Sequence, residues 1–108
     1  MLALTGFLQP CFAYKGDELK KFALEDKKLA ASAPAADSYY AGVYGGYVNG
    51  VSNLLQALKI TCAPDDVTIG QVKDVVFNYM NAHPELLHLE GISIVTRAIN
   101  EVWPCRIK

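Results

Sequence analysis

Two cysteines, Cys62 and Cys105, bracket the second half of the chain, and each has a proline within two residues of it. The segment between them carries two helix-length apolar patterns, so the ends of a helical hairpin should meet where the cysteines lie. A disulfide there would close a loop of about 44 residues and stabilise the fold by about 4 kcal/mol. The alternative is two unpaired buried thiols, because cysteine is often simply a small core residue. We favour the disulfide, since the two residues flank the hairpin.

The first arm of this hairpin begins with a helix-start signal. Thr68 is followed three residues later by Gln71, which is the spacing of a capping box. Apolar residues then recur at the spacing of one helical face, at Val72, Val75, Val76, Tyr79 and Met80. Pro84 disfavours helical geometry at His83. A helix is therefore expected over about residues 68–82.

The second arm follows a short connector. Its apolar residues repeat the same helical spacing, at Ile94, Val95, Ala98, Ile99 and Val102. Pro104 ends the pattern, because proline cannot continue a helix. The two arms together predict a helical hairpin closed by the two cysteines.

The motifs of this half occur in a specific order. The run C-A-P-x-x-V-T-x-G-Q-V-x-D-V-V is followed by H-P-E-L-x-H-L and then by a helix that ends in W-P-C. This stretch resembles the Tai/Rap family, immunity proteins against type VI secretion amidase effectors, in which similar motifs recur in this order. The residues that carry the resemblance are Cys62, Pro64, Val67, Thr68, Gly70, Gln71, His83, Pro84, Glu85, Leu86, His88, Trp103, Pro104 and Cys105.

A weaker resemblance extends upstream. The segment G-Y-V-N-G-V at residues 46–51 is similar to a Gly-Tyr-Ile-x-Gly-Val segment of the family, and G-D-E-L at residues 16–19 resembles its first helix. Many members have a second disulfide between these two helices. The resemblance places its positions at Ala23 and Tyr44, so both cysteines are absent together here.

Two further helices are expected before the hairpin. Residues 15–32 are charged and alanine-rich, Asp17 can cap the start, and the charges are interpreted as a solvated face rather than a binding patch. A second helix should run from Asp37 or Ser38 to about residue 60. Its predicted apolar face is Val43, Tyr47, Val51, Leu54, Leu55 and Leu58. The fold class is therefore all-α, a small bundle of about four to five helices with one disulfide clasping the C-terminal hairpin.

The helix over residues 37–60 contains a stripe of three glycines, Gly42, Gly46 and Gly50, one every fourth residue. Each glycine costs a helix about 1 kcal/mol relative to alanine, so the stripe needs a compensating contact. The contact is either packing against one arm of the hairpin or a homodimer seam. Three tyrosines share a face at the start of this helix, where they are either interface anchors or the edge of the core with wet hydroxyls. They are Tyr40, Tyr44 and Tyr47.

Residues 1–13 differ from the rest. A short apolar run is broken by Pro10, and Cys11 and Ala13 are small residues at the positions that signal peptidase prefers. We interpret this segment as the end of a secretory signal cleaved before Tyr14; the alternative is a buried N-terminal segment of a cytosolic protein. Removal of Cys11 would leave two cysteines, an even number suited to an oxidising compartment.

The totals of the chain exclude several classes of protein. A length of 108 residues and 52% hydrophobic composition predict one folded domain over residues 14–108. The formal net charge of −1 argues against a nucleic-acid partner, which calls for a basic patch. No apolar run approaches the roughly 18 residues that a membrane span requires. We expect neither nucleic acid nor a membrane span.

The only dense cluster of titratable groups lies in the connector, at His83, Glu85, His88 and Glu90. The two histidines are five residues apart across a proline, which does not fit a helical zinc-protease motif. Their alternative role is to meet the last carbonyls of the preceding helix. Since no nucleophile or phosphate-binding motif is present either, we expect no enzyme activity, no cofactor and no metal.

The resemblance implies a periplasmic immunity protein that binds a cell-wall amidase effector and occludes its active site. The candidate contact segments are residues 81–91 and the loop at Pro64-Asp65-Asp66, because a pre-organised loop loses less entropy on binding. The candidate contact residues are Asp65, Asp66, His83, Glu85, His88 and Glu90. Two alternatives stay open: a small helical periplasmic chaperone of the acid-stress type, and an envelope protein that uses the family fold for another purpose.

Overall fold

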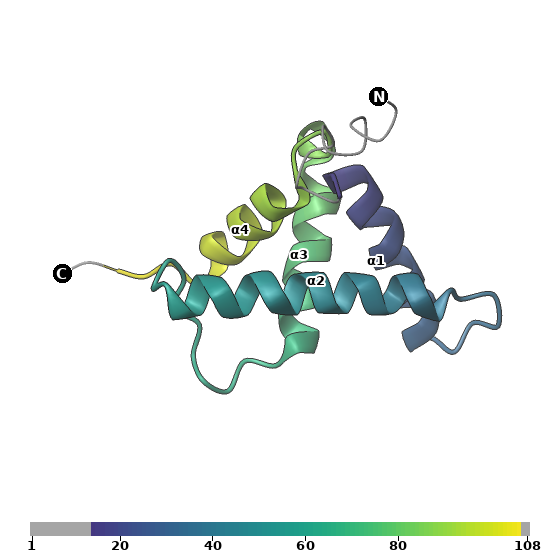
Figure 1. Cartoon of the computed structure of the whole chain (residues 1–108), viewed down its shortest axis with the longest axis horizontal. Helices are drawn as coiled ribbons and strands as arrows, with labels where there is room; N and C mark the ends of the chain where they lie inside the picture. Colours follow the sequence, from purple (N-terminus) through teal and green to yellow (C-terminus); the bar gives the residue numbers. More distant parts are fainter. Residues whose placement is uncertain (1–13, 107–108) are drawn as a thin grey trace, which may run out of the picture.

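Four α-helices and one short 3-10 turn make up the computed structural model, which describes residues 14–106 (Figure 1). In chain order they are α1 (Gly16–Ala30), α2 (Ser38–Ala57), α3 (Ile69–Ala82), η2 (Pro84–Leu86) and α4 (Gly91–Val102). The predicted all-helical class is confirmed. The predicted secretory segment, residues 1–13, lies outside the described residues.

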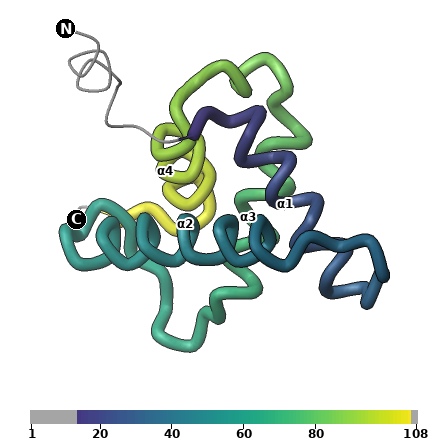
Figure 2. Tube along the Cα trace, turned by 45° about the vertical axis from the view of Figure 1, so that its right-hand side comes forward, coloured from purple at the N-terminus to yellow at the C-terminus, as the bar shows by residue number. Residues whose placement is uncertain are grey.

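The longest helix, α2, packs against each of the other three helices. α1 and α4 lie on either side of α3, and α2 crosses all of them (Figures 1 and 2). The segment after α4 returns to the C-terminal end of α2, so the two ends of the predicted hairpin meet there. Residues 58–68 and residues 83–90 therefore lie at opposite ends of α3.

The hairpin of α3 and α4 agrees with the sequence in its start, its faces and its closure. The N–H of Gln71 donates to the Thr68 hydroxyl at 3.2 Å, and the N–H of Thr68 donates to Oε1 of Gln71 at 2.7 Å, which confirms the capping box. The core-facing residues of the two helices are Val72, Val76, Met80, Ile94, Val95, Ala98 and Ile99. Val102 is 48% exposed, because it lies in the last turn before the chain leaves the bundle.

The disulfide between Cys62 and Cys105 is present, with 4.8 Å between the two Cα atoms and 43 residues of separation. The segments that carry the cysteines are also paired through their backbones. The N–H of Cys62 donates to the Trp103 carbonyl at 2.9 Å, and Thr61 and Pro104 form an isolated antiparallel bridge. The prediction of a disulfide that clasps the hairpin is confirmed.

The orientation of α2 differs from the prediction, although its start does not. Oδ1 of Asp37 accepts from the N–H groups of Tyr39 and Tyr40, so Asp37 is the cap. Leu54 and Leu58 were placed on the buried face, yet they are 53% and 60% exposed. The residues of α2 that are buried are Ala41, Tyr44, Val48 and Leu55. Because α2 has no charged residue, its sequence pattern does not mark which side faces solvent.

The three tyrosines that were expected to share one face, Tyr40, Tyr44 and Tyr47, lie in different environments. Tyr44 is 1% exposed, and its hydroxyl donates to the Lys73 carbonyl at 2.6 Å rather than staying wet. Tyr47 is half-buried, and Tyr40 stacks on Phe22 with 4.6 Å between ring centroids. Tyr44 therefore does not share an exposed surface with the glycines.

The glycine stripe itself faces solvent. A Cβ added at Gly42, Gly46 or Gly50 would meet nothing within 4 Å. Packing of the stripe against an arm of the hairpin, one of the two explanations offered by the sequence, is therefore wrong. The homodimer seam stays a prediction.

The start of α1 depends on a glycine that the sequence pattern did not single out. A Cβ at Gly16 would lie 2.1 Å from Cδ1 of Ile94 and 3.0 Å from the backbone of Leu87. The N–H of Lys15 donates to Oε1 of Glu18 and Lys15 is the cap, so the predicted cap at Asp17 is wrong and α1 begins two residues earlier. Any larger residue would require the Ile94 side chain and the Leu87 backbone to shift, so glycine suits this approach of α1 to the connector.

The charged side of α1 is largely solvated, as predicted, but it also joins α1 to α3. Lys27 pairs with Asp74 at 2.5 Å, and Lys73 pairs with Asp26 at 2.9 Å. The second pair is half-buried. These contacts hold α1 beside α3.

Candidate partner-binding surfaces

The six predicted contact residues fall on two separate surfaces. Asp65 and Asp66 lie in the α2–α3 loop (residues 58–68), whereas the other four lie in or next to the α3–α4 connector (residues 83–90). α3 has 14 residues, so at 1.5 Å per residue its two ends are about 20 Å apart. One narrow cleft of a partner cannot hold all six residues together.

The α3–α4 connector is bonded to the start of α1 through the backbone. The N–H groups of Gly16 and Asp17 donate to the carbonyls of Leu89 and Leu87, each at 2.9 Å, and the N–H of Gly91 donates to the Tyr14 carbonyl at 2.8 Å. The connector is therefore a packed joint between α1, α3 and α4.

Tyr47 lies beneath this joint. A Cβ added at Gly91 would lie 3.0 Å from the Tyr47 hydroxyl, so this glycine also permits a close approach. Burial raises the pKa of Tyr47, and the negative charge of Glu90 raises it further. The side chains on the inner side of the connector thus belong to the packing of the domain.

One histidine of the connector, His83, has the helix-end role that the sequence offered as an alternative. Nδ1 of His83 lies 3.0 Å from the Tyr79 carbonyl, and the imidazole stacks on the Tyr79 ring with 4.1 Å between centroids. His88 is exposed, as is Glu85. Among residues 14–106, no three histidine, cysteine or acidic side chains come together in a way that could hold a metal ion.

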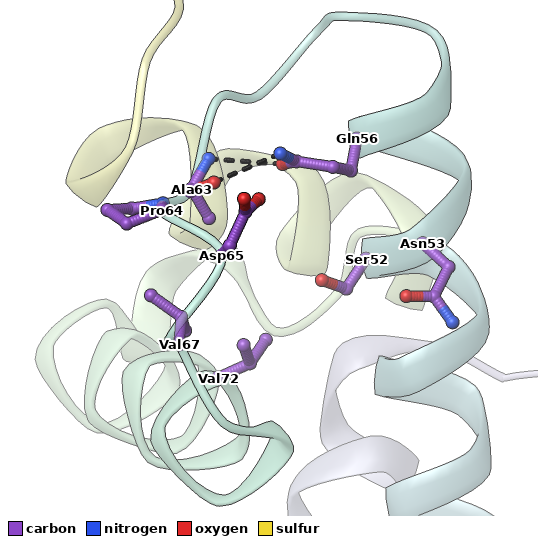
Figure 3. A pocket seen from close by; sticks show the side chains of 8 residues that line it. All are labelled: Ser52, Asn53, Gln56, Ala63, Pro64, Asp65, Val67 and Val72. Carbon is purple, nitrogen blue, oxygen red and sulfur yellow. Dashed lines mark hydrogen bonds between the residues drawn. The ribbon is translucent and has the colours of Figure 1, made fainter.

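The α2–α3 loop is held by one side chain of α2, that of Gln56. Its Nε2 donates to the Ala63 carbonyl at 3.0 Å and its Oε1 accepts from the Ala63 N–H at 3.1 Å, as the dashed lines in Figure 3 show. The adjacent disulfide fixes Cys62, and the N–H of Val67 donates to the Pro64 carbonyl at 3.2 Å. The loop extends away from the helices (Figure 2), yet it is anchored at several points.

A pocket of about 230 Å³ lies between this loop and α2. Its lining residues are Ser52, Asn53, Gln56, Ala63, Pro64, Asp65, Val67 and Val72. Figure 3 shows the Asp65 carboxylate and the Ser52 hydroxyl pointing into the space between loop and helix, with Val67 and Val72 on the side toward α3. The pocket thus combines one carboxylate, one hydroxyl, the side-chain amides of Asn53 and Gln56, and an apolar floor.

Exposed apolar side chains occur at the same end of the molecule. Leu54 and Leu58 near the end of α2, Ile60 in the loop and Ile69 at the start of α3 are 53%, 60%, 45% and 42% exposed. Exposed apolar residues that gather beside a polar rim are typical of surfaces that bind other proteins. This end of the molecule therefore has the composition of a partner-binding surface.

Sequence reasoning placed Asp65 in the loop correctly but missed the residue that positions it. Gln56 is an uncharged polar residue in the last turn of an apolar helix, and its contact with Ala63 crosses a turn whose geometry the sequence does not specify. Lys59, in this turn, has a positive φ of 62°, a conformation that non-glycine residues rarely adopt. No local signal marked either residue.

Comparison with known proteins gives one result. The family model described as Rap1a immunity proteins matches residues 15–105 of the chain. No curated protein and no solved structure gives a significant match. In the part of the chain that the structure describes, no helix is both long enough and apolar enough to cross a membrane.

Proposed function

The chain belongs to the Rap1a immunity protein family, and from this premise we propose that it binds and inhibits a peptidoglycan amidase delivered by type VI secretion. The observation that carries the proposal is the family match, which spans residues 15–105 and so covers all four helices. Membership of an immunity protein family confirms the prediction that the chain is not an enzyme. It also implies a cognate effector as the partner.

The proposed compartment is the periplasm. A cell-wall amidase acts there, and the disulfide between Cys62 and Cys105 is suited to an oxidising compartment. A secretory signal over residues 1–13 would deliver the chain to it. The inhibitor and the enzyme would then meet where the substrate is.

The proposed mode of inhibition is occlusion of the amidase active site by the α2–α3 loop. The loop extends away from the helices (Figure 2), and the two hydrogen bonds from Gln56 hold it before any partner binds. A pre-organised loop loses less conformational entropy on binding. The exposed Leu54 and Leu58 would add apolar contacts around it. The α3–α4 connector is less suited, because its backbone is bonded to α1.

The same proposal includes a second copy of the chain on the outer face of α2. Gly42, Gly46 and Gly50 line a smooth exposed stripe that would let another helix approach closely. The absence of charge along α2 removes a common obstacle to such pairing. Sedimentation of the wild type and of Gly46→Glu tests this part: the variant should sediment as a monomer at concentrations where the wild type is a dimer.

The experiment that tests the function uses the oxidised chain with a tag after Lys108, expressed together with its neighbouring genes. Capture should recover a cell-wall amidase in stoichiometric amount, and the amidase should be inactive on peptidoglycan while it is in the complex. Recovery of no hydrolase, or of a hydrolase that stays fully active in the complex, would contradict the proposal. Capture of many misfolded envelope proteins after acid treatment would instead support the chaperone alternative.

A further inference from the structure

We propose that the pocket between the α2–α3 loop and α2 receives an arginine or lysine side chain of the amidase, with the Asp65 carboxylate as its counter-charge. This inference rests on the proposed function, because it names the chemistry by which the same loop recognises its partner. It goes further in assigning one pocket, one charged residue and one class of side chain.

The arrangement of polar and apolar groups suits a long cationic side chain. Val72 is 5% exposed and Val67 is half-buried, so the floor of the pocket is apolar. Asp65 and Ser52 offer oxygen atoms from opposite walls (Figure 3). Lysine and arginine have an aliphatic stem that packs on apolar surface and a charged end that needs acceptors. The pocket offers an apolar surface for the stem and acceptor oxygens for the charged end.

The volume of the pocket favours a single side chain over a small-molecule ligand. Pockets for metabolites and drug-sized ligands enclose about 300–1,000 Å³ and bury most of the ligand. This pocket encloses about 230 Å³ and lies at the surface, beside an extended loop. A residue that protrudes from a partner protein fits it better than a free metabolite does.

Asp65 has no cation of its own within the described residues. The ion pairs of residues 14–106 are Lys27–Asp74, Lys28–Glu25 and Lys73–Asp26. No lysine or arginine lines the pocket, and Asp66 beside it adds to the local negative charge. A partner cation would therefore be paired without first displacing an internal one.

Gln56 makes the pocket rigid without competing for the ligand. Both ends of its amide are already bonded to Ala63, two residues before Asp65 in the chain. The polar groups of the lining that Gln56 leaves free include the Asp65 carboxylate and the Ser52 hydroxyl (Figure 3). Both are acceptors, as a guanidinium or an ammonium requires.

The first test needs no amidase and uses ethylguanidinium as the probe, followed by the backbone amide shifts of the oxidised protein. Saturable shifts should appear at residues 52, 53, 65 and 67. The uncharged, similarly shaped ethylurea should give none, and Asp65→Asn should abolish them, whereas Asp66→Asn should not. Equal responses to the two compounds, or shifts that persist in Asp65→Asn, would overturn the proposal.

The second test uses the amidase recovered by capture. Asp65→Asn should weaken binding by about 10- to 100-fold, mainly through faster dissociation, as expected for a charge paired in a pocket. The matched variant Asp66→Asn should change affinity by at most about twofold. If Asp65→Asn instead slowed association alone, and if high salt removed the difference from the wild type, Asp65 would only steer the encounter of the two proteins. That result would overturn the pocket assignment.

The two tests separate failure of the inference from failure of the function. If no amidase is captured while ethylguanidinium binds as described, the cation pocket stands and the proposed function fails. If the amidase is captured and inhibited while Asp65→Asn binds like the wild type, the function stands and the pocket assignment fails. The two variants Asp65→Asn and Asp66→Asn should both remain folded, because Asp65 and Asp66 are exposed.

Discussion

The two ends of α3 carry loops of similar length that are held in different ways. The α3–α4 connector is bonded to α1 through backbone groups, and Gly16 and Gly91 let the chains approach closely. The α2–α3 loop is held by a disulfide and by one side chain, Gln56, while its own carboxylates stay unpaired. Four exposed apolar residues, Leu54, Leu58, Ile60 and Ile69, lie beside the second, whereas Ile92 lies beside the first. One end is a structural joint, and the other is rigid and still open to a partner.

The strongest way to break this comparison is to remove the disulfide. Replacing Cys62 and Cys105 together by alanine should lower the free energy of unfolding by about 4 kcal/mol, because a 43-residue separation leaves the unfolded chain much freer. Urea unfolding under oxidising conditions measures the loss. The change should accelerate hydrogen exchange more at residue 62 than at Gly91, and equal acceleration at both would mean that the two ends are not independent.

The next largest effect should come from the connector end. Gly16→Ala should destabilise the fold by about 1–3 kcal/mol, because its Cβ would collide with Ile94 and crowd the backbone of Leu87. The matched variant Gly42→Ala, where the added Cβ meets nothing, should stabilise α2 by about 0.5–1 kcal/mol. Thermal unfolding compares them. Affinity for the amidase should be equal in the wild type and in Gly16→Ala at a temperature where both are folded.

Alkaline pH tests how α2 holds the loop end of α3. Burial, with the nearby charges of Asp26 and Asp74, raises the pKa of Tyr44. The unfolded chain loses this proton near pH 10 while the folded chain keeps it, so stability is unchanged below pH 10. Above pH 10 it should fall by about 1.4 kcal/mol per pH unit.

Two tyrosine substitutions, one buried and one exposed, provide the control for this titration. Tyr44→Phe should reduce the slope of the alkaline decline in the free energy of unfolding but not abolish it, because burial also raises the pKa of Tyr47. The variant also loses the hydrogen bond to the Lys73 carbonyl. Tyr39→Phe should leave the decline as it is, because Tyr39 is 69% exposed. A decline of equal slope in Tyr44→Phe and the wild type would assign it to other groups.

Replacing Gln56 should change stability least, yet it tests the difference between the two ends of α3 most directly. Gln56→Ala should cost about 1 kcal/mol of stability, because it removes two hydrogen bonds to a solvent-exposed segment. Its loss of affinity for the amidase should be larger than this, since the freed loop must be ordered on binding. Calorimetry measures the affinity for the amidase, and urea unfolding measures the free energy of unfolding. If Glu85→Ala at the connector weakens binding more than Gln56→Ala does, the roles of the two ends are reversed.

The parts of the fold that were predicted correctly depend on neighbours in the sequence. The Thr68 cap, the two arms of the hairpin and the cysteines at its ends follow from spacings that a local pattern reports. The outward face of α2 was not predictable in the same way, because an apolar helix without charge has no marked solvent side. Leu54 and Leu58 were assigned to the core for that reason.

The candidate site was predicted only as far as its position along the chain. Asp65 was singled out because it lies between two predicted helices, but the pocket around it requires Gln56 and Ser52 from α2. The requirement for glycine at residue 16 depends on Ile94, which lies 78 residues later in the printed sequence. Contacts over such separations arise from packing, and one sequence does not report them.

The bond between Cys62 and Cys105 also changes what a protease can do to this protein. It makes a covalent ring of residues 62–105, which contains the tip of the α2–α3 loop, α3, the connector and α4. A single cut anywhere inside the ring opens it without releasing a fragment, so the cleaved chain stays in one piece until it is reduced. A cut between α1 and α2 lies outside the ring and leaves α1 held by non-covalent contacts alone. The exposed part of the α2–α3 loop that follows Cys62 can thus be cut without separating the two parts of the chain.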